Sequence, residues 1–174
     1  MAGRAEGVVD ESPARSGPVD FERYVAEHSV ALQRFAYLIA GDPDQARDAV
    51  QEALLGAYPR WSTLIGDPGP YIRRSIVNAH AARWRRHGAE LPVADVTLPG
   101  VRNAEDAVID RQLLRGLARG LTHRQRAGLV LRFYEDRSFA EIGGVLGCSE
   151  ATARSLVHRA LAELRARLSG GSDG

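Results

Sequence analysis

Hydrophobic residues recur every three or four positions along most of the chain, which is the pattern of amphipathic helices. Between Pro70 and Arg86, for example, Ile72, Ile76 and Ala79 fall on one apolar stripe. Pro70 suits a first helical position, because its missing N–H would find no partner there. The sequence contains neither an alternating strand pattern nor an internal repeat. It therefore predicts an all-α protein.

Start and stop signals predict two further helices before this one. Asp20 can cap a helix that ends before Gly41, and Asp42 can cap the next, with Pro43 at its first position. Residues 61–69 are rich in glycine and proline and predict a loop. The first half should therefore be a bundle of three helices.

Segments without an apolar period divide the chain. Residues 1–19 and 169–174 are rich in small and polar residues and are expected to be disordered. Residues 88–104 have no sustained period and indicate a flexible linker. We expect two small helical domains, at 20–87 and 105–168.

The second domain carries the spacing of a helix-turn-helix. Thr122 and Ser138 each begin a capping box, and a glycine turn at Gly147 separates a short helix from a longer one. We expect Phe133 in the core, and Gly143 or Gly144 at a close approach to the longer helix. An ordinary αα-hairpin is the alternative.

A helix-turn-helix presents the first residues of its second helix to the major groove. The candidate DNA-contacting residues there are Thr152, Arg154, Ser155, His158 and Arg159.

The formal net charge of +1 hides an uneven distribution. All 23 basic residues are arginines, and residues 71–86 hold five of them with no acid. Tyr71, Arg74, Asn78 and Arg85 share a polar stripe, which suits nucleic acid because arginine binds phosphate and rings stack on bases. A solvated basic helix end is the alternative interpretation.

A separate acidic and apolar face precedes the basic helix. Its residues are Asp48, Gln51, Glu52 and Leu55. Such a face can simply be exposed to solvent, or it can dock on a basic, apolar partner.

Other function classes find little support. The five histidines are scattered, there is no phosphate-binding glycine loop, and Cys148 is the only cysteine. We expect no catalytic residues, no cofactor and no metal site, and therefore no enzyme. No apolar run approaches a membrane span, so we expect a cytoplasmic protein without membrane insertion.

Four stretches in order resemble a bacterial extracytoplasmic-function (group 4) sigma factor of actinobacterial type. They are Asp44-Gln-Ala-Arg-Asp-Ala-Val-Gln-Glu-Ala-Leu, Tyr71-Ile-Arg-Arg-Ser-Ile-Val-Asn, the sixteen-residue run from Leu121 to Asp136, and Phe139-Ala-Glu-Ile through Arg159. The similarity covers about residues 20–168.

The resemblance implies an alternative sigma factor with two helical domains. The first would bind the β′ clamp helices of RNA polymerase core through Asp48, Gln51, Glu52 and Leu55. It would also read and melt the −10 element, and the second domain would read the −35 element of promoter DNA. An anti-sigma protein is a further implied partner.

The resemblance also assigns residues to the −10 strand. A specificity loop at 62–69 would capture a flipped base, and the helix after it would face the non-template strand. The residues assigned to −10 recognition and melting are Ser62, Thr63, Leu64, Tyr71, Arg74, Asn78, Arg85 and Arg86. Two alternatives remain at this point: a stand-alone helix-turn-helix regulator with a helical interaction domain, and a helical adaptor without DNA contact.

Overall fold

The computed structural model describes residues 18–87 and 120–170, and every regular element in these ranges is helical. The elements are α1 (Pro18–Ala40), α2 (Pro43–Ala57), the 3-10 helix η1 (Tyr58–Thr63), α3 (Gly69–His87), α5 (His123–Leu129), the π-helical η2 (Val130–Tyr134), α6 (Phe139–Leu146) and α7 (Glu150–Gly170). This confirms the all-α prediction. The predicted linker 88–104 lies outside the described residues.

Local capping explains where α2 begins. The Asp42 side chain accepts a hydrogen bond from the Gln45 backbone N–H at 2.8 Å, and Pro43 occupies the first helical position, as predicted. Helix α1 begins at Pro18, before the predicted cap. Asp20 therefore lies in the first turn, where its carboxylate still complements the helix dipole.

The predicted loop at 61–69 is only partly a loop. Trp61 lies in η1 and is buried, because its ring packs against Phe21 and Tyr24 with centroids 4.9 and 5.0 Å away. This aromatic cluster extends helical structure to Thr63. The irregular segment is therefore only 64–68.

Helices α1, α2 and α3 pack together around one apolar core. Ile72, Ile76 and Ala79 of α3 are buried in it, as the apolar stripe predicted. Leu32, Phe35 and Ile39 supply the matching stripe of α1 and are fully buried. Helix α3 is thereby fixed with Arg74, Asn78, Arg85 and Arg86 toward solvent.

The second half forms the predicted helix-turn-helix. Both capping boxes are present, at Thr122 and Ser138, and α6 ends at Gly147 in the left-handed conformation (φ 65°). Gly143 is the close-approach glycine, because a Cβ there would lie 2.6 Å from the Cys148 carbonyl oxygen. Helix α7 continues to Gly170, past the predicted start of the C-terminal tail.

Phe133 does not join the core and is 63 % exposed, contrary to expectation. The reason is the π-helical turn of η2, which widens the helix and changes its phase. Val130 and Leu131 therefore point inward while Phe133 points outward.

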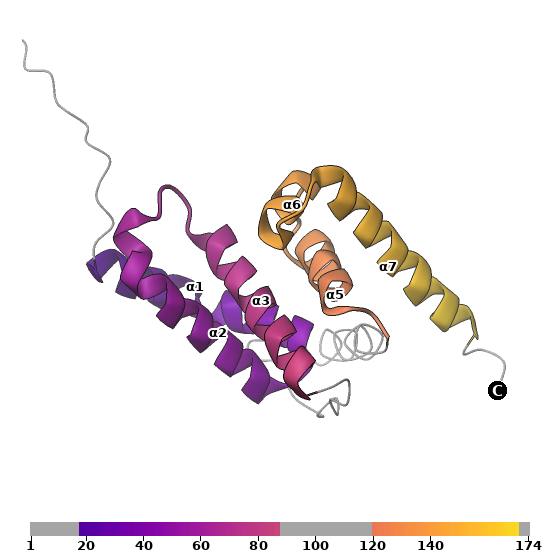
Figure 1. Cartoon of the computed structure of the whole chain (residues 1–174), viewed down its shortest axis with the longest axis horizontal. Helices are drawn as coiled ribbons and strands as arrows, with labels where there is room; N and C mark the ends of the chain where they lie inside the picture. Colours follow the sequence, from indigo (N-terminus) through magenta and orange to yellow (C-terminus); the bar gives the residue numbers. More distant parts are fainter. Residues whose placement is uncertain (1–17, 88–119, 171–174) are drawn as a thin grey trace, which may run out of the picture.

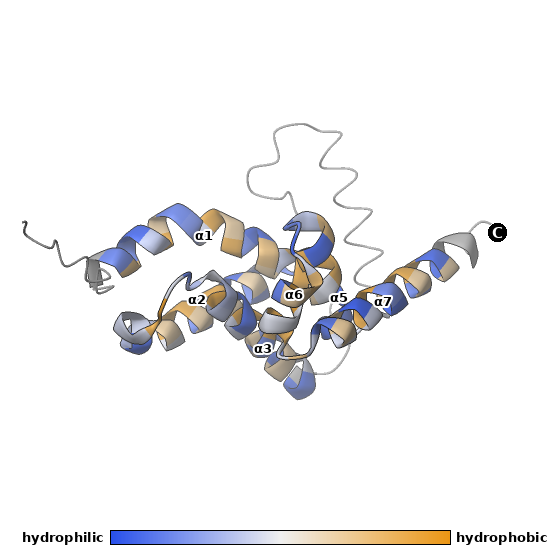
Figure 2. Ribbon diagram, turned by 90° about the horizontal axis from the view of Figure 1, so that it is seen from above, coloured by the Kyte–Doolittle hydropathy of each residue, from blue (hydrophilic) through white to orange (hydrophobic). Residues whose placement is uncertain are grey.

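The two halves pack against each other along α3, which borders α5 and α6, with α7 on the outer side (Figure 1). The hydrophobic second half of α1 points toward the region of α5 and α6 (Figure 2). There the buried Arg126 guanidinium donates to the Ile39 carbonyl oxygen of α1. Within residues 18–87 and 120–170 we find no helix with the length and hydrophobicity of a membrane span.

Candidate promoter and polymerase interfaces

The side of α3 opposite the core is basic and open to solvent. Arg74, Asn78, Arg85 and Arg86 are all exposed. Tyr71 is half-buried and packs against the core, so only part of its ring is available. The predicted polar stripe is therefore present, and its arginines face outward.

Two neighbouring arginines of α3 have different roles. Arg73 is turned inward and forms an ion pair with Glu135, which lies just after η2. Arg74 is exposed, but its guanidinium lies against Gly147, where an added Cβ would be 3.0 Å from its nitrogen. The −10 candidate Arg74 thus touches the turn that precedes the recognition helix.

A cluster of cationic and titratable groups lies where α3 meets α5. Burial, together with the charge of the nearby Arg126, lowers the pKa of His80 to about 4. Burial also lowers the pKa of His123, and it lowers that of Arg126 to about 10. His80 is therefore neutral at physiological pH beside the charged Arg126.

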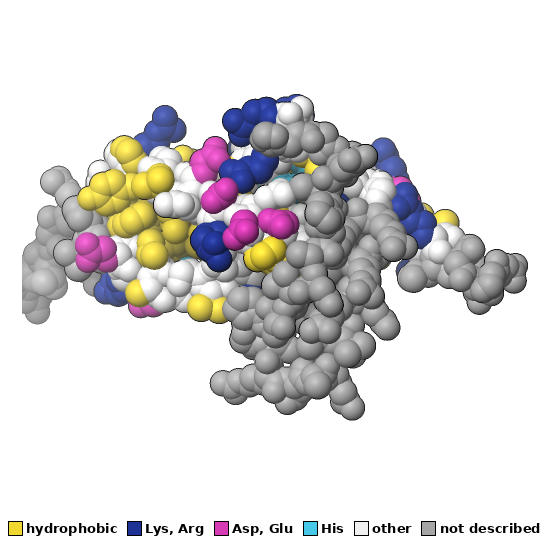
Figure 3. All heavy atoms as spheres, turned by 90° about the horizontal axis from the view of Figure 1, so that it is seen from below, with side chains coloured by type: hydrophobic (Ala, Val, Ile, Leu, Met, Phe, Trp, Pro, Cys, Tyr) yellow, Lys and Arg dark blue, Asp and Glu magenta, His cyan; other side chains and the backbone are white. Residues whose placement is uncertain are grey.

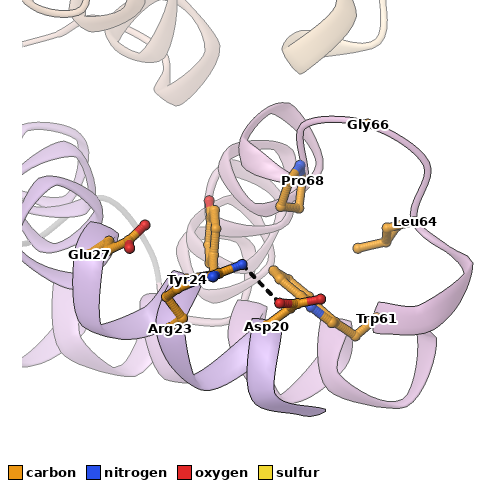
Figure 4. A pocket seen from close by; sticks show the side chains of 8 residues that line it. All are labelled: Asp20, Arg23, Tyr24, Glu27, Trp61, Leu64, Gly66 and Pro68. Atoms are coloured by element: carbon orange, nitrogen blue, oxygen red, sulfur yellow. Dashed lines mark hydrogen bonds and ion pairs between the residues drawn. The ribbon is translucent and has the colours of Figure 1, made fainter. Parts of the chain in front are cut away.

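A cavity of about 300 Å³ opens between α1, η1 and the 64–68 loop (Figure 4). Its lining residues are Asp20, Arg23, Tyr24, Glu27, Trp61, Leu64, Gly66 and Pro68. The Tyr24 hydroxyl and the Trp61 Nε1 are buried, and neither has a hydrogen-bond partner in the described part of the chain. Burial also raises the pKa of Tyr24. Because these two atoms have almost no accessible surface, a ligand in the cavity would instead meet the charged side chains of Asp20, Arg23 and Glu27 and the aromatic rings of the lining.

The loop residues predicted to contact DNA differ in their relation to this cavity. Leu64 lines it, whereas Ser62 and Thr63 are exposed on η1. The Thr63 hydroxyl donates to the Arg60 carbonyl oxygen at 2.7 Å, which holds it at the end of η1. Ile65, at the loop tip, is 99 % exposed.

Helix α7 presents the predicted DNA-reading residues on one exposed side. Thr152, Arg154, Ser155, His158 and Arg159 are all exposed. On the other side, Ala153, Val157 and Ala160 are buried against the rest of the half. The Ser149 hydroxyl caps the helix by accepting from the Thr152 N–H at 3.1 Å.

The acidic and apolar face of α2 is also exposed. Asp48, Gln51 and Glu52 face solvent, and Leu55 is 66 % exposed. Asp48 is not free, because Arg83 of α3 donates to its carboxylate at 2.7 Å. Figure 3 shows hydrophobic side chains gathered beside acidic ones over the N-terminal half.

Sequence reasoning missed three features of these surfaces. Tyr24 and Trp61 share one cavity although they are 37 positions apart, and Arg73 pairs with Glu135 across 62 positions. Phe139 contacts Arg154 of the next helix. An apolar stripe predicts that aromatic residues are buried, but it does not predict which polar groups they meet.

Two family models match the chain. Sigma-70 region 2 matches residues 24–90, and Sigma-70 region 4 matches residues 118–166. The matched parts correspond to the two halves of the structure and together cover most of the sequence.

Curated relatives agree with these matches. An RNA polymerase sigma-E factor of Streptomyces coelicolor is 36 % identical over 155 residues, which cover 86 % of each chain. The ECF RNA polymerase sigma factor SigL of Mycobacterium tuberculosis is 30 % identical over 82 % of this chain and 85 % of its own.

A solved structure shares the fold. The sigma factor RpoE of Bartonella quintana, crystallised with the anti-sigma factor NepR, superposes with a TM-score of 0.71 at 21 % identity, over 89 % of this chain and 99 % of that one. Two family models in chain order, relatives at 30–36 % identity along most of their length and this shared fold lead to one assignment. The chain belongs to the extracytoplasmic-function group of bacterial sigma factors, the alternative sigma factors that bind RNA polymerase core and direct promoter recognition and transcription initiation.

Proposed function

We propose that three exposed surfaces of this sigma factor bind different partners during initiation. Helix α2 docks on core polymerase, the 64–68 loop with α3 binds the −10 strand, and α7 reads the −35 element. The observation that carries this proposal is their separation. The surfaces lie on different elements, and each complements its proposed partner. The α2 face is acidic and apolar, whereas the exposed sides of α3 and α7 carry arginines for DNA.

The −35 assignment rests on the exposed start of α7. Arg154 and Arg159 have the length and charge to reach guanine edges or phosphates, and Thr152 and Ser155 can bond to phosphate or base. Ala153 and Val157 are buried and fix the rotation of α7 about its axis. The DNA-reading residues on the opposite side therefore stay exposed for the major groove.

The −10 assignment rests on the cavity and on α3. A base that leaves the duplex loses stacking and needs a pocket, and its edge needs hydrogen-bond partners. The cavity beside Leu64 is large enough for one base, and its aromatic and charged lining residues, among them Trp61 and Arg23, can stack on a base or bond to its edge. The exposed Arg74, Asn78, Arg85 and Arg86 then bind the strand backbone and bases.

Core docking is assigned to the α2 face. An exposed leucine among acids and an amide suits a partner surface that is basic and apolar, as we expect of the β′ clamp helices. Arg83 forms an ion pair with the Asp48 carboxylate. A basic group of core polymerase that binds Asp48 would therefore share this carboxylate with Arg83.

Family membership supports proposals about regulation and location. RpoE of Bartonella quintana was crystallised with an anti-sigma factor, and we propose that a protein of this class also binds the present chain. Sigma factors are not enzymes in the usual sense, and we propose that this chain acts in the cytoplasm and has no catalytic activity of its own.

Run-off transcription with core polymerase on a genomic promoter library tests the proposal. We expect products that depend on this chain and share −10 and −35 elements. Glu52→Arg and Asp48→Arg should abolish them by preventing holoenzyme formation, whereas Glu163→Arg, on the far part of α7, should not. Palindromic duplex binding without polymerase would instead support a stand-alone regulator.

A further inference from the structure

Phe139, the first residue of α6, lies beside the recognition helix although it was not among the predicted DNA-contacting residues. The Arg154 guanidinium lies 4.8 Å from the centroid of its ring, within the range of a cation–π contact. The ring of His158 meets Phe139 edge-on, with centroids 6.1 Å apart. Two residues assigned to DNA reading therefore converge on one aromatic side chain.

The position of the Phe139 ring is itself fixed. Ser138 and Glu141 form a capping box around the first turn of α6. The hydrogen bonds from Ser138, with a further one from Arg137, lower the pKa of Glu141 to about 2. Phe139 is half-buried and packs against the apolar core. Arg132 of η2 also lies over the ring, 5.0 Å from its centroid.

Arg154 is held from a second direction. Its guanidinium donates to the Glu150 carboxylate at 2.9 Å, one helical turn earlier. Both side chains are 54 % exposed, so this ion pair alone restrains the arginine weakly. The rigid ring and the carboxylate together limit the directions in which the guanidinium can point.

An exposed arginine normally loses considerable rotamer freedom when it binds, and a side chain already held in its binding orientation loses less. We propose that Phe139 is a positioning residue for promoter recognition, whose ring holds the Arg154 guanidinium oriented toward the DNA. The inference rests on the proposed role of α7 at the −35 element.

A double-mutant cycle in the full holoenzyme tests this role. Core polymerase carrying the wild-type chain, Phe139→Leu, Arg154→Ala or both is titrated with a promoter selected by the run-off experiment. Leucine keeps an apolar side chain at the site but removes the aromatic face. We expect Phe139→Leu to weaken binding by about two- to fivefold when Arg154 is present, and to change nothing further in Arg154→Ala.

Two further variants separate positioning from packing. Phe139→Trp retains an aromatic face and should keep the wild-type affinity. Phe133→Leu makes the same change on an exposed ring of η2, whereas the cation–π contact of Arg154 is with Phe139, so it should leave promoter affinity unchanged.

Three results would overturn the inference. An equal loss from Phe139→Leu with and without Arg154 would show that the ring acts only through packing. Full affinity of Phe139→Leu would remove its role while leaving the proposed function intact. Full affinity of Arg154→Ala would contradict the −35 assignment of this arginine, and the positioning role would fail with it.

Discussion

Arg73 and Glu135 join the two halves of the molecule through an ion pair in which the side chains are only 10 % and 9 % exposed. Removing one partner of a buried pair leaves the other charge without compensation, at a cost of about 3 kcal/mol or more. Glu135→Gln should therefore lower the free energy of unfolding in urea by about that amount.

Glu163→Gln is the matched control for this prediction. Its ion pair with Arg167 is more exposed, so the change should stay below about 1 kcal/mol. Equal stability of both variants would mean that the two halves do not pack in this way in the free protein.

The buried His80 predicts a loss of stability in mild acid. Its pKa is about 4 in the folded chain and about 6.5 when unfolded, so the unfolded state binds a proton first as the pH falls. The stability contributed by neutral His80 is complete above pH 6.5 and is lost toward pH 4. Between pH 7.5 and 5 we expect a decrease of about 2 kcal/mol in urea unfolding.

His80→Leu should make the stability less dependent on pH over this range, whereas the exposed His158→Gln should not. A pH profile unchanged by His80→Leu would contradict the prediction and point to His123, whose pKa is also lowered by burial.

Alanine substitutions at the two adjacent glycines of α6 should change protein stability in opposite directions. A Cβ at Gly143 would lie 2.6 Å from the Cys148 carbonyl oxygen, whereas one at Gly144 would meet nothing within 4 Å. Gly143→Ala should destabilise the protein by about 1–3 kcal/mol, because the turn must shift. Gly144→Ala should stabilise it by up to about 1 kcal/mol through helix propensity. Thermal unfolding of the two variants measures both effects. Stability changes of the same sign would contradict the close contact between Gly143 and the turn.

Leu55 should contribute strongly to polymerase docking. Leu55→Asp places a charge in the apolar part of the α2 face, and we expect core affinity to fall by about tenfold or more. Val30→Asp alters a comparably exposed side chain on α1, outside this face, and should leave core affinity unchanged. Titration of labelled core polymerase measures the affinity of both variants. Equal affinities would show that the docking surface does not include Leu55.

Tyr71 should matter more for strand opening than for duplex binding. Stacking of one base on an aromatic side chain contributes about 1–3 kcal/mol, so Tyr71→Ala should reduce promoter opening by about tenfold. Permanganate footprinting reports opening, and binding to a −35 fragment reports the duplex contact. Tyr134→Ala, on an exposed ring of η2, is the control. Equal losses in both assays would contradict the stacking role.

Local signals in the sequence were enough for much of this architecture. Asp42, Thr122 and Ser138 start helices where their side chains can cap them, and the stripe around Ile72 is buried as its spacing predicted. These features depend on contacts within one or two turns, which a single sequence displays directly.

Features that depend on distant partners were not predictable in this way. The π-helical turn exposes Phe133 against its apolar pattern, and Trp61 is buried by partners on α1. The cavity and the Arg73–Glu135 pair arise only when segments far apart in the chain meet.

The contact between Arg74 and the turn at Gly147 has a consequence for affinity. Arg74 is one of the residues proposed to bind the −10 strand, and its guanidinium lies against this turn of the second half. An arginine engaged in that contact is less available to DNA. Measured promoter affinity should therefore equal the intrinsic affinity reduced by the fraction of molecules in which the contact is open. Substitutions at the interface between the halves should change apparent DNA binding without touching DNA.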